Sequence, residues 1–392
     1  MIWLDITDPK YALFFQPLLP HLLGLDSVLI TSRVSSGYEE CAQILSHAIE
    51  SHHRANPSFR ERLKLHFIGG YGGANRLDKY CARLDRERGF LELFARLGEL
   101  PRVFITGASV EGAQCAFGLG VPVVHFSDTP IAGHEFSPSA ITLLARLSLP
   151  LSCLVFYPFV IPSSVYKAFG LDSSNIICYD FIDPALYLPD MQSPLTPDSS
   201  TLQSRPQSAQ TLMQSEKKHN YTPLIIAREE EYKAHYVSSH LRLWYEGVHA
   251  LARENVDILI IPRYGREELE LEFGTYSNIQ IAQHIIAPEQ LYAHADLLLG
   301  GGGTMNLEAC YYGIPTISTR SLLLYHDCYL IEHNLMRHVS DLDSLMQAFR
   351  EIQQTGFARK NPAESKALFA PTPIAQSLQQ IADIIAARFF AS

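Results

Sequence analysis

The chain of 392 residues is 47% hydrophobic and 18% charged, and its formal net charge is −10. A chain of this length and apolar content can bury two cores of ordinary size, so we expect two domains. The acidic balance argues against a nucleic-acid partner, because phosphate backbones are bound by clustered Lys and Arg. Seven cysteines without a Cys-x-x-Cys pair favour a reducing compartment over a disulfide framework or a zinc site. We therefore expect a cytoplasmic protein.

Two apolar segments invite a membrane interpretation, and neither supports it. Residues 1–7 are short, lack a basic lead and contain Asp5, which predicts a first strand rather than a signal peptide. Residues 143–160 are interrupted by Arg146, Pro150 and Pro158, which predicts the end of a helix followed by a buried strand. No transmembrane span is expected.

In chain order, short β-rich runs alternate with amphipathic stretches. The first runs predict strands at residues 2–6, 27–31, 65–68, 103–106, 121–126 and 153–157. Residues 190–220 are rich in Ser, Gln and Pro and contain no aromatic residue, which predicts a disordered interdomain insert. The alternation resumes with predicted strands at residues 224–227, 257–261, 279–282, 297–299 and 316–318, and an amphipathic stretch at 372–390 predicts a last helix. This rhythm indicates an α/β chain with two doubly wound parallel sheets, in domains at residues 1–189 and 221–371.

The most informative segment is a strand that ends in four consecutive glycines at residues 300–303 and is followed by a short helical pattern. Glycine allows a ligand to approach the backbone, and a helix that begins where a strand ends directs N–H groups and a positive dipole at an anion. Gly313, Ile314 and Pro315 end the helix. The segment predicts a nucleotide diphosphate site, although it is not a Walker loop because no Gly-Lys-Ser/Thr follows. The alternative is a tight strand-to-helix turn without a ligand.

Polar residues near the predicted strand ends supply the other candidates for this site. Glu308 lies about one turn into the helix, on a side that can face the turn, where its carboxylate could accept hydrogen bonds from ribose hydroxyls. Arg228, Lys233 and Arg263 are the cations expected near a pyrophosphate. Each has a structural alternative: Glu308 could simply be solvated, and the cations could cap helices or pair with nearby glutamates.

These motifs carry a family resemblance. The segment Gly-Gly-Thr-Met-Asn-Leu-Glu-Ala at 302–309 resembles the donor-binding motif of GT-B enzymes such as the MurG-type glycosyltransferases and the hydrolysing UDP-GlcNAc 2-epimerases. Over nearly its full length apart from the insert, the chain resembles the DUF354 family of predicted glycosyltransferase-like proteins. The other matching segments are Trp3-Leu4-Asp5-Ile6-Thr7-Asp8-Pro9, Phe14-Phe15-Gln16-Pro17-Leu18, Ile68-Gly69-Gly70-Tyr71-Gly72-Gly73, Ala116-Phe117-Gly118-Leu119-Gly120-Val121-Pro122, Lys233-Ala234-His235-Tyr236 and Ile261-Pro262-Arg263.

The resemblance implies a GT-B-like fold, in which two Rossmann-like domains face a central cleft and the C-terminal helix at 372–392 packs back on the first domain. It also implies a UDP-linked nucleotide sugar as co-substrate, with no other cofactor and no metal, and a glycan or lipid-linked acceptor. Contact with the inner face of the membrane would be peripheral. The residues expected to bind the donor are Gly301, Gly302, Gly303, Thr304, Asn306, Glu308, Arg228, Lys233 and Arg263.

The general base is harder to assign. Members of the family carry histidines after the first strand, in an Asn-Pro-Pro-His-Val-His-Phe-Phe setting, where this chain has Tyr11 and Leu13. They also tend to have an acidic residue and a histidine after the aspartate that matches Asp128, where Thr-Pro-Ile stands here. Either Asp8 or Asp128 serves as the base, the alternative for each being a helix N-cap, or the chemistry is altered or lost in this chain.

Three functions remain open from the sequence. The first is a metal-independent GT-B-type glycosyltransferase that uses a nucleotide sugar in cell-envelope or surface-glycan synthesis. The second is a hydrolysing nucleotide-sugar 2-epimerase or hydrolase, which would use the same donor domain without an acceptor. The third is a non-catalytic nucleotide-sugar sensor or scaffold, which the replaced loop histidines favour.

Overall fold

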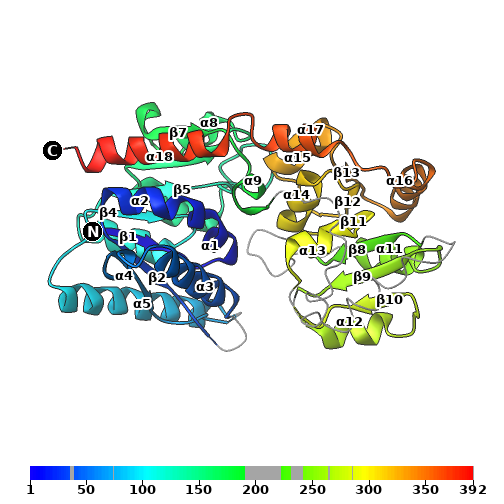
Figure 1. Cartoon of the computed structure of the whole chain (residues 1–392), viewed down its shortest axis with the longest axis horizontal. Helices are drawn as coiled ribbons and strands as arrows, with labels where there is room; N and C mark the ends of the chain where they lie inside the picture. The colour runs from blue at the N-terminus through cyan, green and yellow to red at the C-terminus, as the bar shows by residue number, and fades with distance from the viewer. Residues whose placement is uncertain are drawn as a thin grey trace. The chain divides into compact units, whose positions relative to one another are not determined.

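The computed structural model of the chain describes residues 1–35, 39–73, 75–189, 222–230, 242–263, 265–284 and 286–391. It divides the chain into two compact units, Met1–Tyr187 with Ala370–Ser392 (unit 1) and Leu188–Phe369 (unit 2). Each unit is built on one parallel sheet with helices packed against it (Figure 1). The predicted insert at 190–220 and Lys233 lie outside the described residues.

Unit 1 holds a seven-stranded sheet in the order β3-β2-β1-β4-β5-β6-β7, and every neighbouring pair is parallel. The register places Asp5 opposite Thr31 and Thr106, so these strands reach the carboxyl edge together. The strands are β1 Ile2–Asp5, β2 Val28–Ser32, β3 Leu63–Phe67, β4 Val103–Thr106, β5 Val123–Phe126, β6 Leu154–Pro158 and β7 Ile176–Tyr179.

The helices of unit 1 cover both faces of its sheet, because alternate strand residues point to opposite sides. Ile2 and Leu4 pack against one set of helices, whereas Trp3 lies on the other side with Phe90 and Phe104. The helices are α1 Pro9–Phe15, α2 Leu19–Leu25, α3 Glu40–Ala55, α4 Phe59–Arg62, α5 Arg76–Leu97, α6 Val110–Gly118, α7 Leu143–Ser148, α8 Ser163–Lys167, α9 Pro184–Tyr187 and α18 Ile374–Phe389.

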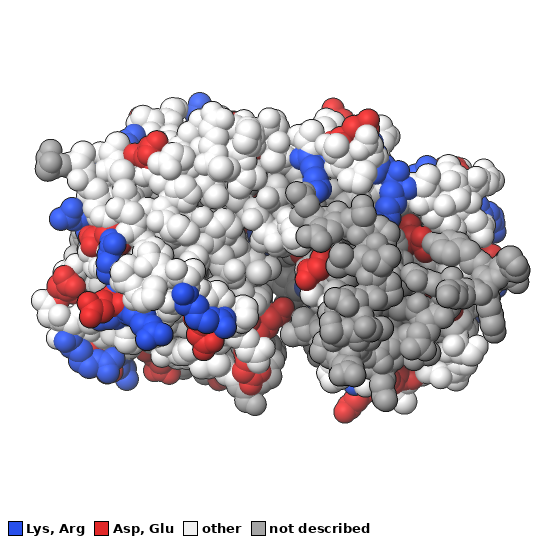
Figure 2. Space-filling model, in the orientation of Figure 1, with Lys and Arg blue, Asp and Glu red and all other residues white. Residues whose placement is uncertain are grey.

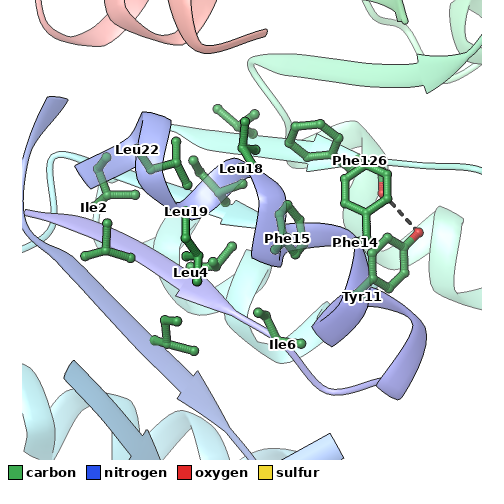
Figure 3. Packing of buried hydrophobic residues seen from close by; sticks show 14 of the residues in the cluster. Ile2, Leu4, Ile6, Tyr11, Phe14, Phe15, Leu18, Leu19, Leu22 and Phe126 are labelled. Carbon is green, nitrogen blue, oxygen red and sulfur yellow. Dashed lines mark hydrogen bonds between the residues drawn. The ribbon is translucent and has the colours of Figure 1, made fainter. Parts of the chain in front are cut away.

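An aromatic cluster fixes α1 against the sheet. Phe14 and Phe15 each lie with their ring centroids 5.3 Å from that of Phe126, and the Tyr11 hydroxyl lies 3.3 Å from the Phe126 carbonyl oxygen (Figure 3). The last helix, α18, joins this core through Leu378, Ile381 and Ile385, so the C-terminal end of the chain is part of unit 1.

Unit 2 holds a six-stranded parallel sheet in the order β10-β9-β8-β11-β12-β13. Its strands are β8 Leu224–Arg228, β9 Asp257–Ile261, β10 Ile279–Ile281, β11 Leu297–Gly300, β12 Thr316–Ser318 and β13 Arg337–His338. Its helices are α11 Leu243–Leu251, α12 Arg266–Phe273, α13 Pro288–Ala293, α14 Gly303–Tyr311, α15 Tyr325–Glu332, α16 Leu342–Gln354 and α17 Pro362–Phe369. Both sheets run outward from a central strand in the Rossmann manner, which confirms the predicted fold class of two doubly wound parallel-sheet domains.

Charged side chains of both signs lie close together on part of the surface of unit 1 (Figure 2). In Figure 2, Lys and Arg side chains lie among Asp and Glu side chains along the edge where α5 runs. Among the helices of the described residues, none is both long enough and apolar enough to cross a bilayer.

Candidate functional site

The glycine turn lies at the carboxyl edge of the sheet in unit 2, where three strands end together. Gly300 pairs with Arg228 of β8 on one side and with Ser318 of β12 on the other. The Gly301 N–H donates to the Arg228 carbonyl at 2.9 Å, and the Thr319 N–H donates to the Gly300 carbonyl at 3.0 Å. Residues that follow β8, β11 and β12 are therefore brought to one place by the sheet itself.

Helix α14 begins directly from this turn without a side-chain cap. Gly302 is the N-cap residue, and glycine has no side chain with which to cap the first amides of the helix. The first N–H groups of a helix have no intrahelical acceptor, so they are directed at whatever lies beyond the end. Gly303 is half-buried and Thr304 is exposed, whereas Gly301 and Gly302 are buried. The accessible part of the turn is thus its helical end.

Other groups pack closely against the turn, and Gly301 is the position where backbone leaves least room for a side chain. A Cβ atom at Gly301 would lie 2.6 Å from the backbone nitrogen of Glu230, and one at Gly302 would lie 2.7 Å from Nη2 of Arg263. A Cβ at Gly303 would lie 3.3 Å from Nη1 of Arg320. Two guanidinium groups therefore sit against the start of α14.

Arg320 was not among the residues predicted from the sequence. It follows β12 within two residues, so the rule that selected Arg263 after β9 would also have found it. Arg320 is 9% exposed, and its Nη1 donates to Asp327 Oδ2 at 2.7 Å in the first turn of α15. His338 of β13 contacts the Arg320 carbonyl through Nε2 at 2.9 Å. The arginine is held from both its side chain and its backbone.

Two predicted donor contacts are not supported by this geometry. The Gly301 N–H is already bonded to the Arg228 carbonyl, so it has no proton to offer a phosphate. Asn306 is fully buried, and its Nδ2 donates to the Ser318 hydroxyl at 3.2 Å. Its Oδ1 occupies the space that a side chain at Gly300 would need. Asn306 supports the turn from inside the domain.

The two acidic residues after β8 accept hydrogen bonds from neighbouring segments of the site. Glu229 accepts from the Tyr245 hydroxyl at 2.8 Å and from the backbone N–H of Arg263 at 3.2 Å. Glu230 accepts from the N–H and hydroxyl of Ser321 at 2.7 and 2.5 Å. Both carboxylates are buried and fix the segments that carry the two arginines.

Arg228 and Glu308, both predicted donor ligands, have different settings. Nη1 of Arg228 donates to the carbonyls of Ile261, at 3.2 Å, and Pro262, which holds the end of β9 beside Arg263. Glu308 is 7% exposed on α14, and its Oε2 accepts from the Tyr292 hydroxyl at 2.8 Å. Unit 2 contains the glycine turn together with Arg263, Arg320 and Glu308. The predicted ligand Lys233 lies outside the described residues.

The candidate bases lie in unit 1. Asp8 is exposed and caps α1, its Oδ1 accepting from the Lys10 N–H at 2.8 Å. Asp128 accepts from the Tyr11 hydroxyl at 3.0 Å and pairs with the Lys10 ammonium, which also contacts Asp183 at 2.7 Å. Burial alone would lower the pKa of Lys10, but Asp128 and Asp183 raise it above its ordinary value. The ammonium therefore stays charged.

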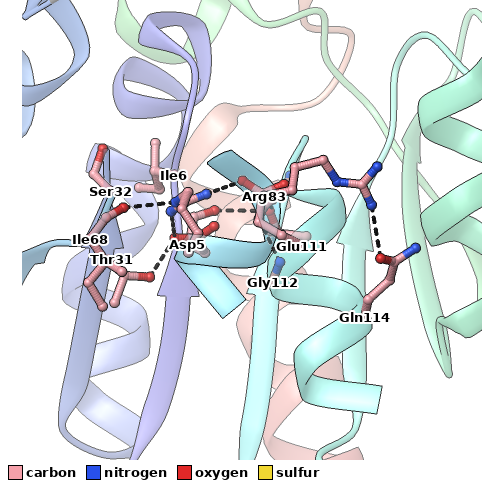
Figure 4. A network of polar contacts seen from close by, with 12 residues as sticks. Asp5, Ile6, Thr31, Ser32, Ile68, Arg83, Glu111, Gly112 and Gln114 are labelled. Atoms are coloured by element: carbon pink, nitrogen blue, oxygen red, sulfur yellow. Dashed lines mark hydrogen bonds and ion pairs between the residues drawn. The ribbon is translucent and has the colours of Figure 1, made fainter. Parts of the chain in front are cut away.

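A second polar network is sealed inside unit 1 (Figure 4). Arg86 of α5 is 1% exposed and contacts Asp5 Oδ1 through Nη2 at 2.8 Å, Glu111 through Nη1, and the Ile68 carbonyl through Nε at 2.9 Å. Gly69, at the start of the glycine loop 69–73, has φ +68° and packs on the Arg86 stem. This loop is anchored at its first residue. Within the described residues, no group of three or more His, Cys, Asp or Glu side chains is arranged to hold a metal ion.

Solved structures with the same fold cover the whole chain. UDP-GlcNAc 2-epimerase from Neisseria meningitidis, solved bound to UDP-GlcNAc, is 13% identical with a TM-score of 0.67, covering 99% of this chain and 100% of that one. The glycotransferase of kitacinnamycin is 14% identical with a TM-score of 0.57, covering 99% and 98%. Together with the two parallel-sheet units, these likenesses define the fold as GT-B.

Sequence comparison gives the family. The family described as "Protein of unknown function (DUF354)" matches residues 1–369, and the chain belongs to it. An uncharacterized protein of Methanocaldococcus jannaschii is 24% identical over 356 residues, which are 88% of this chain and 89% of that protein. The resemblance predicted from the sequence is confirmed.

Proposed function

We propose that unit 2 binds a UDP-linked nucleotide sugar, with its diphosphate at the start of α14 between Arg263 and Arg320. The observation that carries this proposal is the meeting of two guanidinium groups at an uncapped, glycine-built helix N-terminus. A diphosphate offers oxygens that guanidinium groups bind with charge-assisted hydrogen bonds, and the amides of Gly302, Gly303 and Thr304 add main-chain donors. Glu308 would accept from the ribose hydroxyls.

The reaction we propose is sugar transfer to a hydroxyl acceptor. When the glycosidic bond breaks, negative charge grows on the departing diphosphate, and the α14 dipole with Arg263 and Arg320 would stabilise it. A carboxylate of unit 1, Asp8 or Asp128, would act as the general base that deprotonates the acceptor hydroxyl. The resemblance to MurG-type enzymes supports a glycan or lipid-linked acceptor and a role in cell-envelope or surface-glycan synthesis.

Ligand-induced stabilisation tests the donor site. A ligand at a hundred times its Kd stabilises the folded state by about 2.7 kcal/mol, which corresponds to roughly 5–10 °C for a unit of this size. We expect UDP and UDP-sugars to raise the melting temperature of the full chain, and Arg320→Gln or Arg263→Gln to reduce the rise. Arg337→Gln is the matched control, since Arg337 is exposed and pairs with Glu351. No shift at millimolar UDP or UDP-sugar would refute the proposal.

A 2-epimerase or hydrolase is the second candidate, because the chain shares its fold over 99% of its length with an epimerase solved with UDP-GlcNAc. Incubation of UDP-GlcNAc with the protein alone, followed by NMR, separates the two enzymes. Turnover without an acceptor favours the epimerase or hydrolase. Binding with no turnover in the presence of any acceptor favours the third function, a sensor or scaffold.

A further inference from the structure

We propose that Tyr292 is a positioning residue that fixes Glu308 for the ribose of the bound nucleotide, and that Arg359 holds Tyr292 in place. The inference rests on the proposed function, because it concerns the ribose end of the same donor site. It assigns a role to two residues that belong neither to the glycine turn nor to the arginines around it.

Tyr292 donates a hydrogen bond that orients the Glu308 carboxylate. It is fully buried on α13, and its hydroxyl lies 2.8 Å from Glu308 Oε2. The same hydroxyl is 3.4 Å from the Met305 carbonyl, but it has one proton, and the shorter bond to a carboxylate is the stronger. The proton therefore goes to Glu308.

A fixed donor such as Tyr292 can orient a ribose-binding carboxylate. A carboxylate can accept about four hydrogen bonds, so the bond from Tyr292 takes up one of these and does not by itself exclude the two vicinal ribose hydroxyls. A glutamate side chain otherwise loses rotamer entropy when a ligand orders it. With Tyr292 in place, that ordering precedes binding.

Arg359 anchors the short helix that carries Tyr292. Its Nη2 lies 2.9 Å from the carbonyl oxygen of Tyr292, 3.1 Å from that of Ala293 and 2.8 Å from that of Ala295, at the C-terminal end of α13, and shares its two protons among them. A cation there satisfies carbonyls that lack intrahelical partners and interacts favourably with the helix dipole. A helix of six residues is not stable by itself, so this anchor sets where Tyr292 lies.

The packing around Tyr292 supports the same role. Its ring centroid lies 5.7 Å from that of Tyr312, which directly follows α14 and whose hydroxyl donates to the Pro189 carbonyl at 2.9 Å. The ring is held on α14 as well as on α13, so its hydroxyl has little freedom to leave Glu308.

The test compares a ribonucleotide with one that lacks the ribose hydroxyls. UDP and 2′,3′-dideoxy-UDP are titrated into the full chain and into Tyr292→Phe by isothermal calorimetry. We expect the variant to bind UDP about fivefold more weakly, the effect of losing one hydrogen bond, with dideoxy-UDP affinity changed less than twofold. Arg359→Met is expected to lose ribose selectivity in the same way. Adding Tyr292→Phe to Glu308→Ala is expected to cause no further loss.

Tyr329→Phe is the matched control, because it removes a hydroxyl that donates to the Leu368 carbonyl at 3.0 Å. Its affinity for both nucleotides should equal that of the unaltered chain. Equal weakening of both nucleotides by Tyr292→Phe, or unchanged UDP affinity, would overturn the inference and leave the donor site standing. If the unaltered chain binds no UDP, the proposed function fails and the inference with it.

Discussion

Replacing Arg86 with Met should destabilise unit 1 by about 3–5 kcal/mol at neutral pH, the usual cost of removing one partner from a buried ion pair. Arg86 is 1% exposed and lies between Asp5, which is fully buried, and Glu111, which is 6% exposed. Methionine fills the space of the aliphatic stem but leaves two carboxylates without their cation. For a unit of this size the loss corresponds to a fall in melting temperature of roughly 6–20 °C.

The sign of the pH dependence makes this prediction specific. In the unaltered chain, burial raises the pKa of Glu111, but the charge and hydrogen bond of Arg86, a backbone hydrogen bond and the Arg33 charge together lower it, so the net shift is downward. Glu111 therefore adds stability that is present above its unfolded pKa of about 4.3 and is lost as the pH falls through the folded value. Without Arg86, only a backbone hydrogen bond and the Arg33 charge oppose burial, so we expect the folded pKa of Glu111 to rise above the unfolded one. The stability deficit of the variant should be largest near pH 7 and should shrink as the pH falls towards 4.

The chain's two tryptophans allow unit 1 to be observed alone. Trp3 is buried in unit 1 and Trp244 in unit 2, so a Trp244→Phe background leaves Trp3 as the fluorescence reporter during urea unfolding. The double variant Arg86→Met/Glu111→Gln should recover part of the loss, because one uncompensated charge is removed. A loss below about 1 kcal/mol, or a loss that does not change between pH 7 and 5, would refute the reasoning.

Three further predictions concern single positions. Gly301→Ala should lower the free energy of unfolding by about 1–3 kcal/mol, because its Cβ would lie 2.6 Å from the Glu230 backbone. Gly303→Ala should lower it by less than about 1 kcal/mol, because its Cβ would lie 3.3 Å from a flexible guanidinium group. Urea unfolding compares the two variants, and equal losses would contradict the packing. Burial lowers the pKa of His125 to about 4, so stability should fall by about 3 kcal/mol as the pH drops from 6.5 to 4, and His125→Gln should remove that dependence in melting curves. Lys10→Met should lower the melting temperature at pH 7 by several degrees, because two carboxylates lose their shared cation; an unchanged melting temperature would count against the ion cluster.

Strands with a continuous apolar run are the part of the fold that the sequence predicts best. The runs at Val103–Thr106 and Asp257–Ile261 were predicted with the bounds observed, because fully buried parallel strands need several consecutive apolar residues. Two edge strands were missed. Arg337–His338 is short and polar, and Ile176–Tyr179 has only two aliphatic residues. Both exist because a neighbouring strand offers them hydrogen bonds, which no local pattern reveals.

The candidate site also has parts that the sequence predicts and parts that depend on tertiary contacts. The turn at Gly300 could be predicted, since consecutive glycines between a strand and a helix allow a tight turn and a close approach to the backbone. The inward position of Asn306 could not, because it depends on the Ser318 hydroxyl of the next strand. The functions of Glu229 and Glu230 were also hidden: they brace the arginine loops through contacts with residues far away along the chain. Propensity locates the site, and tertiary contacts decide which side chains line it.

The two carboxylates proposed as base differ in their surroundings. Lys10 lies against Asp128 and is itself held by Asp183, so one oxygen of Asp128 is engaged in an ion pair and is less accessible to an acceptor hydroxyl. The Tyr11 hydroxyl occupies the other oxygen of Asp128 at 3.0 Å. Asp8 is exposed, and the hydrogen bond that orients it comes from a backbone amide. If unit 1 supplies a base for sugar transfer, these surroundings favour Asp8, and they leave Asp128 to hold the Lys10 ammonium at the carboxyl edge of the sheet.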